Sequence, residues 1–106
     1  TIVKIFLHIS KDEQKQRLQA RLDNVVKHWK FNPDDLKDRA RWDDFQEVYE
    51  DLIAKTSTES APWYVVPADR KWYRNLVVAR IIVDTLKDLD MKFPIADWMA
   101  EDIVID

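Results

Sequence analysis

The chain has 106 residues, a formal net charge of −3 and a pI of about 5.3, enough for one small domain and unfavourable for general nucleic-acid affinity. It has no cysteine, which excludes disulfides, cysteine zinc sites and thiol nucleophiles, and no glycine, which excludes GxxxxGK[ST] and GxGxxG phosphate loops and glycine-lined nucleophile elbows. No apolar run approaches the roughly 20 residues of a membrane span and no signal peptide opens the sequence, so we expect a cytoplasmic protein without a membrane partner.

The first predicted elements are a strand and a helix. The segment Ile2–Ile9 is nearly continuous apolar sequence rich in β-branched residues, which predicts a buried parallel strand. Ser10-Lys11-Asp12-Glu13 then matches a capping box, in which the serine hydroxyl and the glutamate satisfy each other's exposed amides. A helix is predicted from there through Leu22. We interpret His8 as a satisfied core or edge residue rather than a catalytic one.

Two arginines lie on this first predicted helix. Arg17 and Arg21 are four residues apart and therefore share one helix face. Arginines in that register can clamp a phosphate group bidentately. They can equally form a solvated face paired with Glu13 or Asp12, and their spacing does not decide between the two interpretations.

The segment from Asp23 to Phe31 is too irregular to assign. Its core, Lys27-His28-Trp29-Lys30-Phe31, interleaves cations with aromatic side chains. Such a pattern is consistent with nucleic-acid stacking, with the aromatic anchor of a mobile loop, or with a packing hinge. We favour a hinge or lid.

A long helix is predicted from Pro33 to about Lys55. Asn32 suits the N-cap and Pro33 the first helical position. Apolar residues predicted to face the core recur at helical spacing: Leu36, Trp42, Phe45, Val48, Tyr49, Leu52 and Ile53. Carboxylates gather on the opposite face: Asp43, Asp44, Glu47, Glu50 and Asp51. We interpret them as a solvated face rather than a metal or acid/base site, since no EF-hand spacing is present.

The stretch APWYVVPADRKWYRN (61–75) contains the second predicted strand, Trp63–Pro67, which two prolines delimit. Arg70, Lys71 and Arg74 fall where that strand ends and the next helix begins. In open α/β sheets, ligands bind at this edge, and helix N-termini favour anions, so phosphate is the first ligand to consider. An ordinary solvated helix start is the alternative.

The last predicted helix covers Asp69–Leu89, and its apolar residues spread around enough of its circumference to predict burial on more than one side. The role of residues 91–106 is not readable from the sequence. Two parallel strands with helices give an α/β class but too few strands for a covered sheet. We therefore expect either the C-terminal part of a larger α/β domain or a chain whose sheet a partner completes. The absence of an initiating methionine is consistent with this.

The sequence resembles the C-terminal half of family-2 polyphosphate kinases. The resemblance rests on FLHIS, the two arginines four apart, KHWK, the acidic and aromatic helix, and APWYVVPADRKWYRN, and it covers roughly residues 4–90. It implies a P-loop, thymidylate-kinase-like three-layer sandwich, of which this chain is a single partial domain (1–106) with a helical lid at about 17–42. It also implies an enzyme that transfers a phosphoryl group between inorganic polyphosphate and a nucleotide such as AMP or ADP, with Mg²⁺, and a homo-oligomer.

The resemblance gives the basic residues a common role. Arg17, Arg21 and Lys30 match the family's basic lid positions, and Lys71 and Arg74 match its cations after the last strand. We predict these five as phosphate or polyphosphate contacts, since phosphoryl transfer is catalysed mostly by positioning and by neutralising oxygens. The aromatic matches, Trp29 and Trp63, are expected to pack.

Some family features have no counterpart in this sequence. The glycine-rich loop with its lysine and aspartate, and the later aspartate and arginine, would lie upstream of Thr1, and Val25 stands where the family usually has proline. We assign no catalytic or metal-binding residue to this chain and expect it to be inactive alone. The competing hypothesis is a non-catalytic α/β interaction module that docks another protein through Trp29, Trp72 or Trp98. Nucleic acid is not expected as a partner.

Overall fold

Two parallel strands form the centre of the structure, a computed structural model that describes residues 1–106. Strand β1 (Lys4–His8) pairs with strand β2 (Trp63–Pro67), with Lys4 opposite Trp63 and His8 opposite Pro67. Both predicted strands are thus present, the first one shorter at its ends. Because the pairing is parallel, His8 and Pro67 end at the same sheet edge, where chemistry-bearing side chains were expected.

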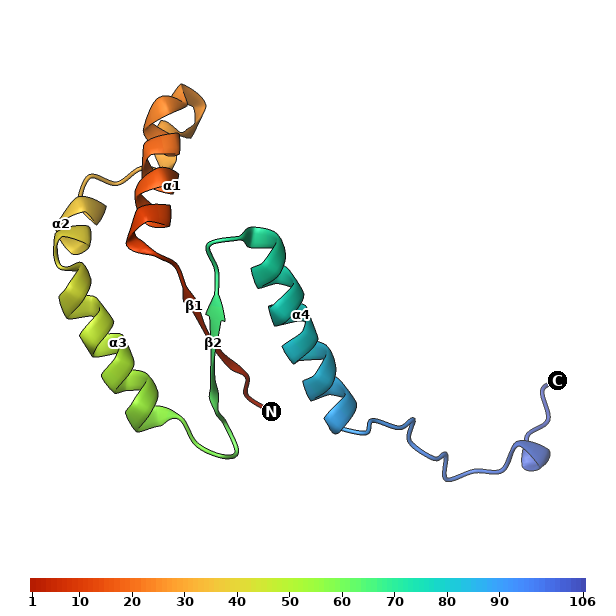
Figure 1. Ribbon diagram of the computed structural model, residues 1–106. Helices are drawn as coiled ribbons and strands as arrows, with labels where there is room; N and C mark the ends of the chain where they lie inside the picture. The colour runs from red at the N-terminus through yellow and green to blue at the C-terminus, as the bar shows by residue number, and fades with distance from the viewer.

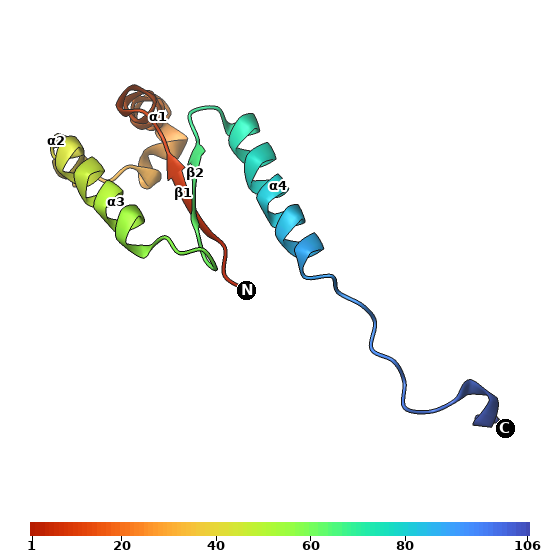
Figure 2. The same ribbon diagram turned by 60° about the horizontal axis from the view of Figure 1, so that its bottom comes forward.

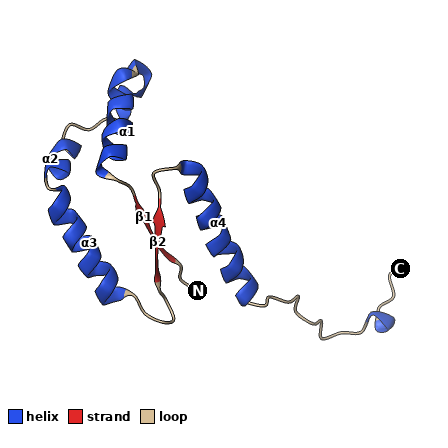
Figure 3. Ribbon diagram, viewed as in Figure 1, coloured by secondary structure: helices blue, strands red, loops and turns tan.

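Helices cover both faces of this pair of strands (Figure 1). The connection from β1 to β2 contains α1 (Lys11–Asp23), the 3₁₀ helix η1 (Val25–Lys30), α2 (Asp35–Ala40) and α3 (Trp42–Thr56), and α4 (Lys71–Asp88) follows β2. Figure 3 shows these helices and strands by type. In Figure 2 the strands lie between α1 and α3 on one side and α4 on the other. The three layers expected for an α/β sandwich are therefore present.

Only half of the predicted capping box forms at the start of α1. The Ser10 hydroxyl accepts the backbone N–H of Glu13 at 3.1 Å, as expected for an N-cap. The Ser10 N–H does not bond to Glu13; it donates to Asp69 Oδ1 at 2.7 Å, while the Glu13 carboxylate pairs with Arg17. The helix start is therefore tied to the end of the second strand rather than closed on itself.

The predicted helix from Pro33 to Lys55 is two helices. It is broken at Arg41, whose backbone angles (φ −104°, ψ 30°) lie outside the helical region. The first helix also begins two residues after Pro33, because Asn32 forms a local turn in which its side chain accepts the Asp34 N–H at 3.0 Å. No proline or glycine marks the break, so local sequence carried no signal for it.

Aromatic side chains hold α3 against the sheet. The ring of Phe6 in β1 lies 5.1 Å from Tyr49, which in turn lies 6.0 Å from Phe45. At the far end of the helix, Trp63 Nε1 donates to Thr56 Oγ1 at 2.8 Å. The predicted packing role of Trp63 is thereby met, whereas Trp29 is 79% exposed and does not pack on this chain.

The chain has almost no interior of its own. Only Val66 and Ala68 are buried, each 1% exposed. The radius of gyration is 22.5 Å, against the roughly 13 Å of a compact domain of this length. The predicted burial of α4 on more than one side is wrong for this chain, since it contacts the sheet along one side and Leu76 and Leu86 stay exposed on others.

Residues beyond α4 run away from the layered part of the structure (Figures 1 and 2). Asp90 turns the chain with a positive φ of 44°, and an otherwise extended segment carries one short 3₁₀ helix, η2 (Ala100–Asp102). Every residue from Met91 to Asp106 is exposed. Among all the helices, none combines the length and the apolar character that crossing a membrane requires.

Candidate functional site

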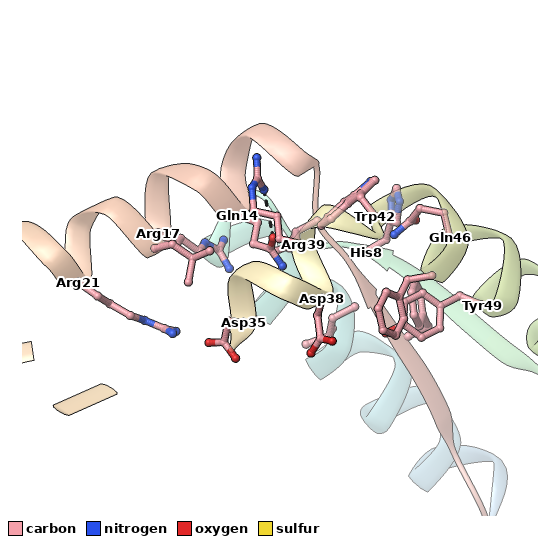
Figure 4. Close-up of a pocket in the computed structure, with 15 residues that line it drawn as sticks. His8, Gln14, Arg17, Arg21, Asp35, Asp38, Arg39, Trp42, Gln46 and Tyr49 are labelled. Carbon is pink, nitrogen blue, oxygen red and sulfur yellow. Dashed lines mark hydrogen bonds between the residues drawn. The ribbon is translucent and has the colours of Figure 1, made fainter. Parts of the chain in front are cut away.

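A groove of about 540 Å³ opens at the carboxyl end of β1, between that strand and helices α1, α2 and α3 (Figure 4). Its aromatic wall consists of Phe6, Trp42, Phe45 and Tyr49. Its polar residues are His8, Gln14, Arg17, Arg21, Asp35, Asp38, Arg39 and Gln46. The groove combines apolar side chains with converging charges, which is the usual character of a ligand site.

Helical spacing explains which side chains reach the groove. Gln14, Arg17 and Arg21 are three and four residues apart and lie on one face of α1. Asp35 and Asp38 lie on the matching face of α2. The two helices thus turn charged faces toward one another across the groove.

Arg17 is held in place by three hydrogen bonds. Its Nε donates to Glu13 Oε1 at 3.0 Å, and its Nη2 donates to the backbone carbonyls of Ala68 at 2.9 Å and Asp69 at 3.0 Å. The pairing with Glu13 that the sequence allowed is therefore present. The Nη1 group has no partner in the structure, so two N–H donors remain for a ligand.

Asp69 completes a junction between α1 and the end of β2. Its carboxylate accepts the Ser10 N–H at 2.7 Å. This backbone hydrogen bond and a side-chain one from Ser10 are the main causes that lower the pKa of Asp69. Desolvation opposes them, and the positive charges of Arg17 and His8 lower the pKa further. Asp69 therefore remains a carboxylate over a wide pH range and links the strand end to the helix start.

Arg21 is less constrained than Arg17. Its single contact is a long one, from Nη1 to the carbonyl of Lys30 at 3.5 Å. Figure 4 shows its guanidinium pointing across the groove toward Asp35. Arg21 thus keeps most of its donors available for an anion.

Arg39 is a groove residue that the sequence reasoning missed. Its Nη1 donates to the carbonyl of Lys11 at 2.7 Å and to Gln14 Oε1 at 3.1 Å, which ties α2 to α1. The sequence did contain a signal for this residue, in its helical spacing from Trp42. Asp35, Asp38 and Arg39 lie seven, four and three residues before Trp42, which places all three on the apolar face of the predicted helix.

The other three predicted phosphate contacts lie outside the groove. Lys30 places its ammonium 5.1 Å from the centre of the Trp29 ring. Lys71 is exposed at the first position of α4. Arg74 lines a shallow hollow on the opposite sheet face, with Ile5 and Val78. The structure thus brings Arg17 and Arg21 together. Lys30 meets Arg21 only through its backbone carbonyl, at 3.5 Å, and Lys71 and Arg74 lie on other surfaces.

The arrangement favours an anion more than a metal ion. Three guanidinium groups converge on a partly apolar groove, where reduced solvent strengthens their interaction with a negative group. Asp35 and Asp38 offset part of this charge. No group of three histidine or acidic side chains is placed to hold a metal ion.

Comparison with known proteins assigns the chain to a family. The sequence profile described as "Polyphosphate kinase 2 (PPK2)" matches residues 1–94. The chain belongs to the polyphosphate kinase 2 family. The resemblance seen in the sequence motifs is thereby confirmed, and it reaches slightly further at both ends than the residues that carried it.

Individual members of the polyphosphate kinase 2 family are similar over most of this chain. The AMP/ADP-polyphosphate phosphotransferase of Meiothermus ruber is 58% identical over 106 residues, covering 100% of this chain and 40% of that protein. The ADP-polyphosphate phosphotransferase of Rhodopseudomonas palustris is 48% identical over 93 residues, covering 88% of this chain and 32% of that protein.

A solved family structure confirms the fold class. The crystal structure of polyphosphate kinase 2 from Arthrobacter aurescens TC1 matches with a TM-score of 0.90 and 51% identity, covering 95% of this chain and 36% of that one. Two parallel strands with flanking helices therefore form the same arrangement in both proteins. The chain spans less than half the length of each of these relatives.

Proposed function

We propose that this chain forms the lid and C-terminal part of an enzyme that transfers a phosphoryl group between inorganic polyphosphate and a nucleoside mono- or diphosphate. The observation that carries the proposal is the groove, where Arg17 and Arg21 project from one face of α1 at the carboxyl end of β1. Membership of the polyphosphate kinase 2 family supports it, as do relatives named as AMP/ADP- and ADP-polyphosphate phosphotransferases.

The groove arginines suit the chemistry of this transfer. In phosphoryl transfer, negative charge spreads over the oxygens of a loose transition state, and catalysis consists mainly of positioning and charge neutralisation. Guanidinium groups bind such oxygens with paired, planar N–H donors. We assign Arg21, with its free donors, to direct contact with the phosphates, and Arg17 to contact through Nη1 from a fixed position.

Lys30, Lys71 and Arg74, the other three predicted phosphate contacts, lie outside the groove and would contact only other parts of a polyphosphate chain. Lys71, at the first turn of α4, and Arg74, on its sheet-facing side, lie near the same strand ends as the groove but on other surfaces. Lys30 lies on η1, the segment we propose as part of the lid. A polyphosphate chain that extends beyond the groove would contact these three cations separately, because they do not form one binding site with the groove arginines.

Several features of the complete enzyme belong to the proposal as expectations. Mg²⁺ would neutralise phosphate oxygens. We expect it to be held mainly by residues outside these 106. We also propose a cytoplasmic enzyme that works as a homo-oligomer. The acceptor is a nucleotide, either a monophosphate or a diphosphate.

The test is substitution of Arg21→Ala in the full gene product that contains this sequence. Formation of ATP from ADP and polyphosphate, and of ADP from AMP and polyphosphate, would be measured by coupled assay. We expect kcat/KM to fall by about 100-fold or more, as when a fixed donor to a developing oxyanion is removed. The thermal unfolding temperature should change little, because Arg21 makes only one long hydrogen bond.

Lys37→Ala is the matched control. Lys37 is a cation of α2 that lies outside the groove, with 80% of its side chain exposed and an ion pair to Asp34 at 2.8 Å. Its removal should leave kcat/KM within about threefold of the unmodified enzyme, as expected for an exposed ion pair. Equal losses for both variants, or full activity of Arg21→Ala, would contradict the assignment of the groove.

A further inference from the structure

Gln14 is a neutral side chain among the charged residues of the groove. It lies on α1 three residues before Arg17 and seven before Arg21, which places the three side chains on one helix face. The residue is partly buried, and its amide carries one acceptor oxygen and two N–H donors. Which end of the amide faces the groove therefore decides what Gln14 can bind.

Arg39 determines which end of this amide faces the groove. Its Nη1 donates to Gln14 Oε1 at 3.1 Å (Figure 4) and to the backbone carbonyl of Lys11 at 2.7 Å. A guanidinium group has donors only, so the amide must turn its oxygen toward Arg39 and its nitrogen the other way. Gln14 Nε2 has no partner in the chain, and no unpaired side-chain nitrogen is buried. Its two N–H donors are therefore accessible from the groove that Gln14 lines.

A purely structural role would use only half of this side chain. The bond to Arg39 joins α1 to α2 across 25 residues of sequence, and the amide oxygen alone is sufficient for it. The same bond holds the amide in one orientation and so presents two N–H donors next to Arg17, one helical turn away. Donors that are already oriented need no rearrangement when negative charge develops, which is the condition for stabilising it.

We propose that Gln14 is a neutral hydrogen-bond donor to phosphoryl oxygens in the groove, and that Arg39 is the positioning residue that orients its amide. This inference rests on the proposed function, since it takes the groove as the phosphate site. Arg17 and Arg21 supply positive charge, whereas Gln14 supplies direction. An uncharged donor adds hydrogen bonds of fixed geometry that are weaker than charge-assisted ones, so the groove can orient phosphoryl oxygens and still release the product.

Gln14→Glu in the full gene product separates a ligand contact from a structural link. Glutamate keeps an oxygen for Arg39, makes that bond charge-assisted and suits the first turn of α1, so the thermal unfolding temperature should not fall. It also replaces the two donors with a carboxylate that repels phosphate. We expect kcat/KM for forming ATP from ADP and polyphosphate to fall by about 100-fold or more. The dissociation constant for polyphosphate, measured by calorimetry, should rise about tenfold or more. A structural link alone predicts no loss in either quantity.

Gln16→Glu is the matched control. It makes the same change of charge on the same helix, but Gln16 is exposed and lies outside the groove. Two residues separate it from Gln14, which places it on roughly the opposite side of α1. Its kcat/KM should stay within about threefold of the unmodified enzyme, as expected for an exposed charge. The difference between the two glutamate variants then measures the position in the groove rather than the added charge.

Substitutions of Arg39 test its positioning role. Arg39→Ala frees the Gln14 amide to rotate, so we expect kcat/KM to fall by about tenfold. Arg39→Lys still offers donors to Gln14 Oε1 and should recover all but about threefold of that loss. Once Gln14→Met has removed the amide, Arg39→Ala should lower kcat/KM by at least about threefold less than it does alone. Fully additive losses would contradict an action of Arg39 through Gln14.

Arg21→Ala, measured alongside, separates this inference from the proposed function. If Arg21→Ala is impaired while folded Gln14→Glu behaves like Gln16→Glu, the role of Gln14 is overturned and the groove remains the phosphate site. If neither Arg21→Ala nor Gln14→Glu changes activity, the proposed function of the groove fails as well. Should Gln14→Glu not fold, Gln14→Met decides the question. We expect it to lose about tenfold in kcat/KM without a lower unfolding temperature, and full activity would overturn the inference.

Discussion

Single residues at the junction of α1 and β2 determine how the groove is held. Asp69 accepts the Ser10 N–H at 2.7 Å, and Arg17 donates to the carbonyls of Ala68 and Asp69. Ala68 is one of the two buried residues of the chain. The junction therefore fixes Arg17 relative to the strand ends, which is the preorganisation that the proposed phosphate site would require.

Asp69→Asn tests this junction through its pH dependence. Since the pKa of Asp69 is lowered in the folded protein, its charge stabilises the fold fully above the ordinary aspartate pKa, and that stabilisation is lost as pH falls toward the folded value. Thermal unfolding of the full gene product should show Asp69→Asn less stable at pH 7, with the difference shrinking below about pH 4. A difference that grows in acid would contradict this account. Asp43→Asn, at a carboxylate without a hydrogen bond, is the control.

At the scale of elements, the break at Arg41 gives α2 and α3 separate tasks. Helix α2 contacts α1 through Arg39, which bonds to Lys11 and Gln14, while α3 packs on β1 through Tyr49. A straight helix could not orient both segments in this way. The groove exists because the helical connection bends around it.

The attachment of α3 can be measured with Tyr49→Ala. Removing this ring takes away its contacts with Phe6 at 5.1 Å and Phe45 at 6.0 Å. Because Tyr49 is only partly buried, we expect a loss of about 2 kcal/mol, below the range for fully buried aromatic residues, in urea unfolding of the full gene product. The neighbouring Val48→Ala should cost less than about 0.5 kcal/mol, since Val48 is exposed. Equal effects would argue against the aromatic contacts.

For the whole molecule, the dominant feature is how little apolar surface is removed from water. Two residues of 106 are buried, and large apolar side chains remain exposed on α3, α4 and both strands. Folding requires enough burial to offset conformational entropy, which these contacts do not provide. This runs against a self-contained interaction module, the alternative that the sequence left open, which would need a core of its own.

Expression of residues 1–106 alone tests this conclusion. We expect broad, non-cooperative thermal unfolding and rapid amide hydrogen exchange, because the layers lack covering elements. The full gene product should unfold cooperatively under the same conditions. Sharp two-state unfolding of the 106 residues as a monomer would show that the exposed surfaces are sufficient by themselves, contrary to this expectation.

Local patterns in the sequence were sufficient to predict most of the helices and strands. Apolar runs and prolines predicted both strands, Ser10 predicted the cap of α1, and apolar periodicity predicted α4, because each depends on residues close in sequence. The spacing of Arg17 and Arg21 likewise placed them on one face. The incompleteness of the sheet followed from counting strands, and family membership from motifs spread over the chain.

Contacts between segments that are distant in sequence decided how the elements pack and which charged residues come together. Ser10 bonds to Asp69 across 59 residues instead of to its neighbour Glu13, and Arg39 reaches α1 across 28 residues. The packing of α2 against α1 holds Arg39 in the groove, and the layering of the elements places Arg74 on the opposite sheet face. The sequence determined which residues carry charge and which helix face they share. The tertiary structure decided which of them meet, because that depends on how separate elements pack.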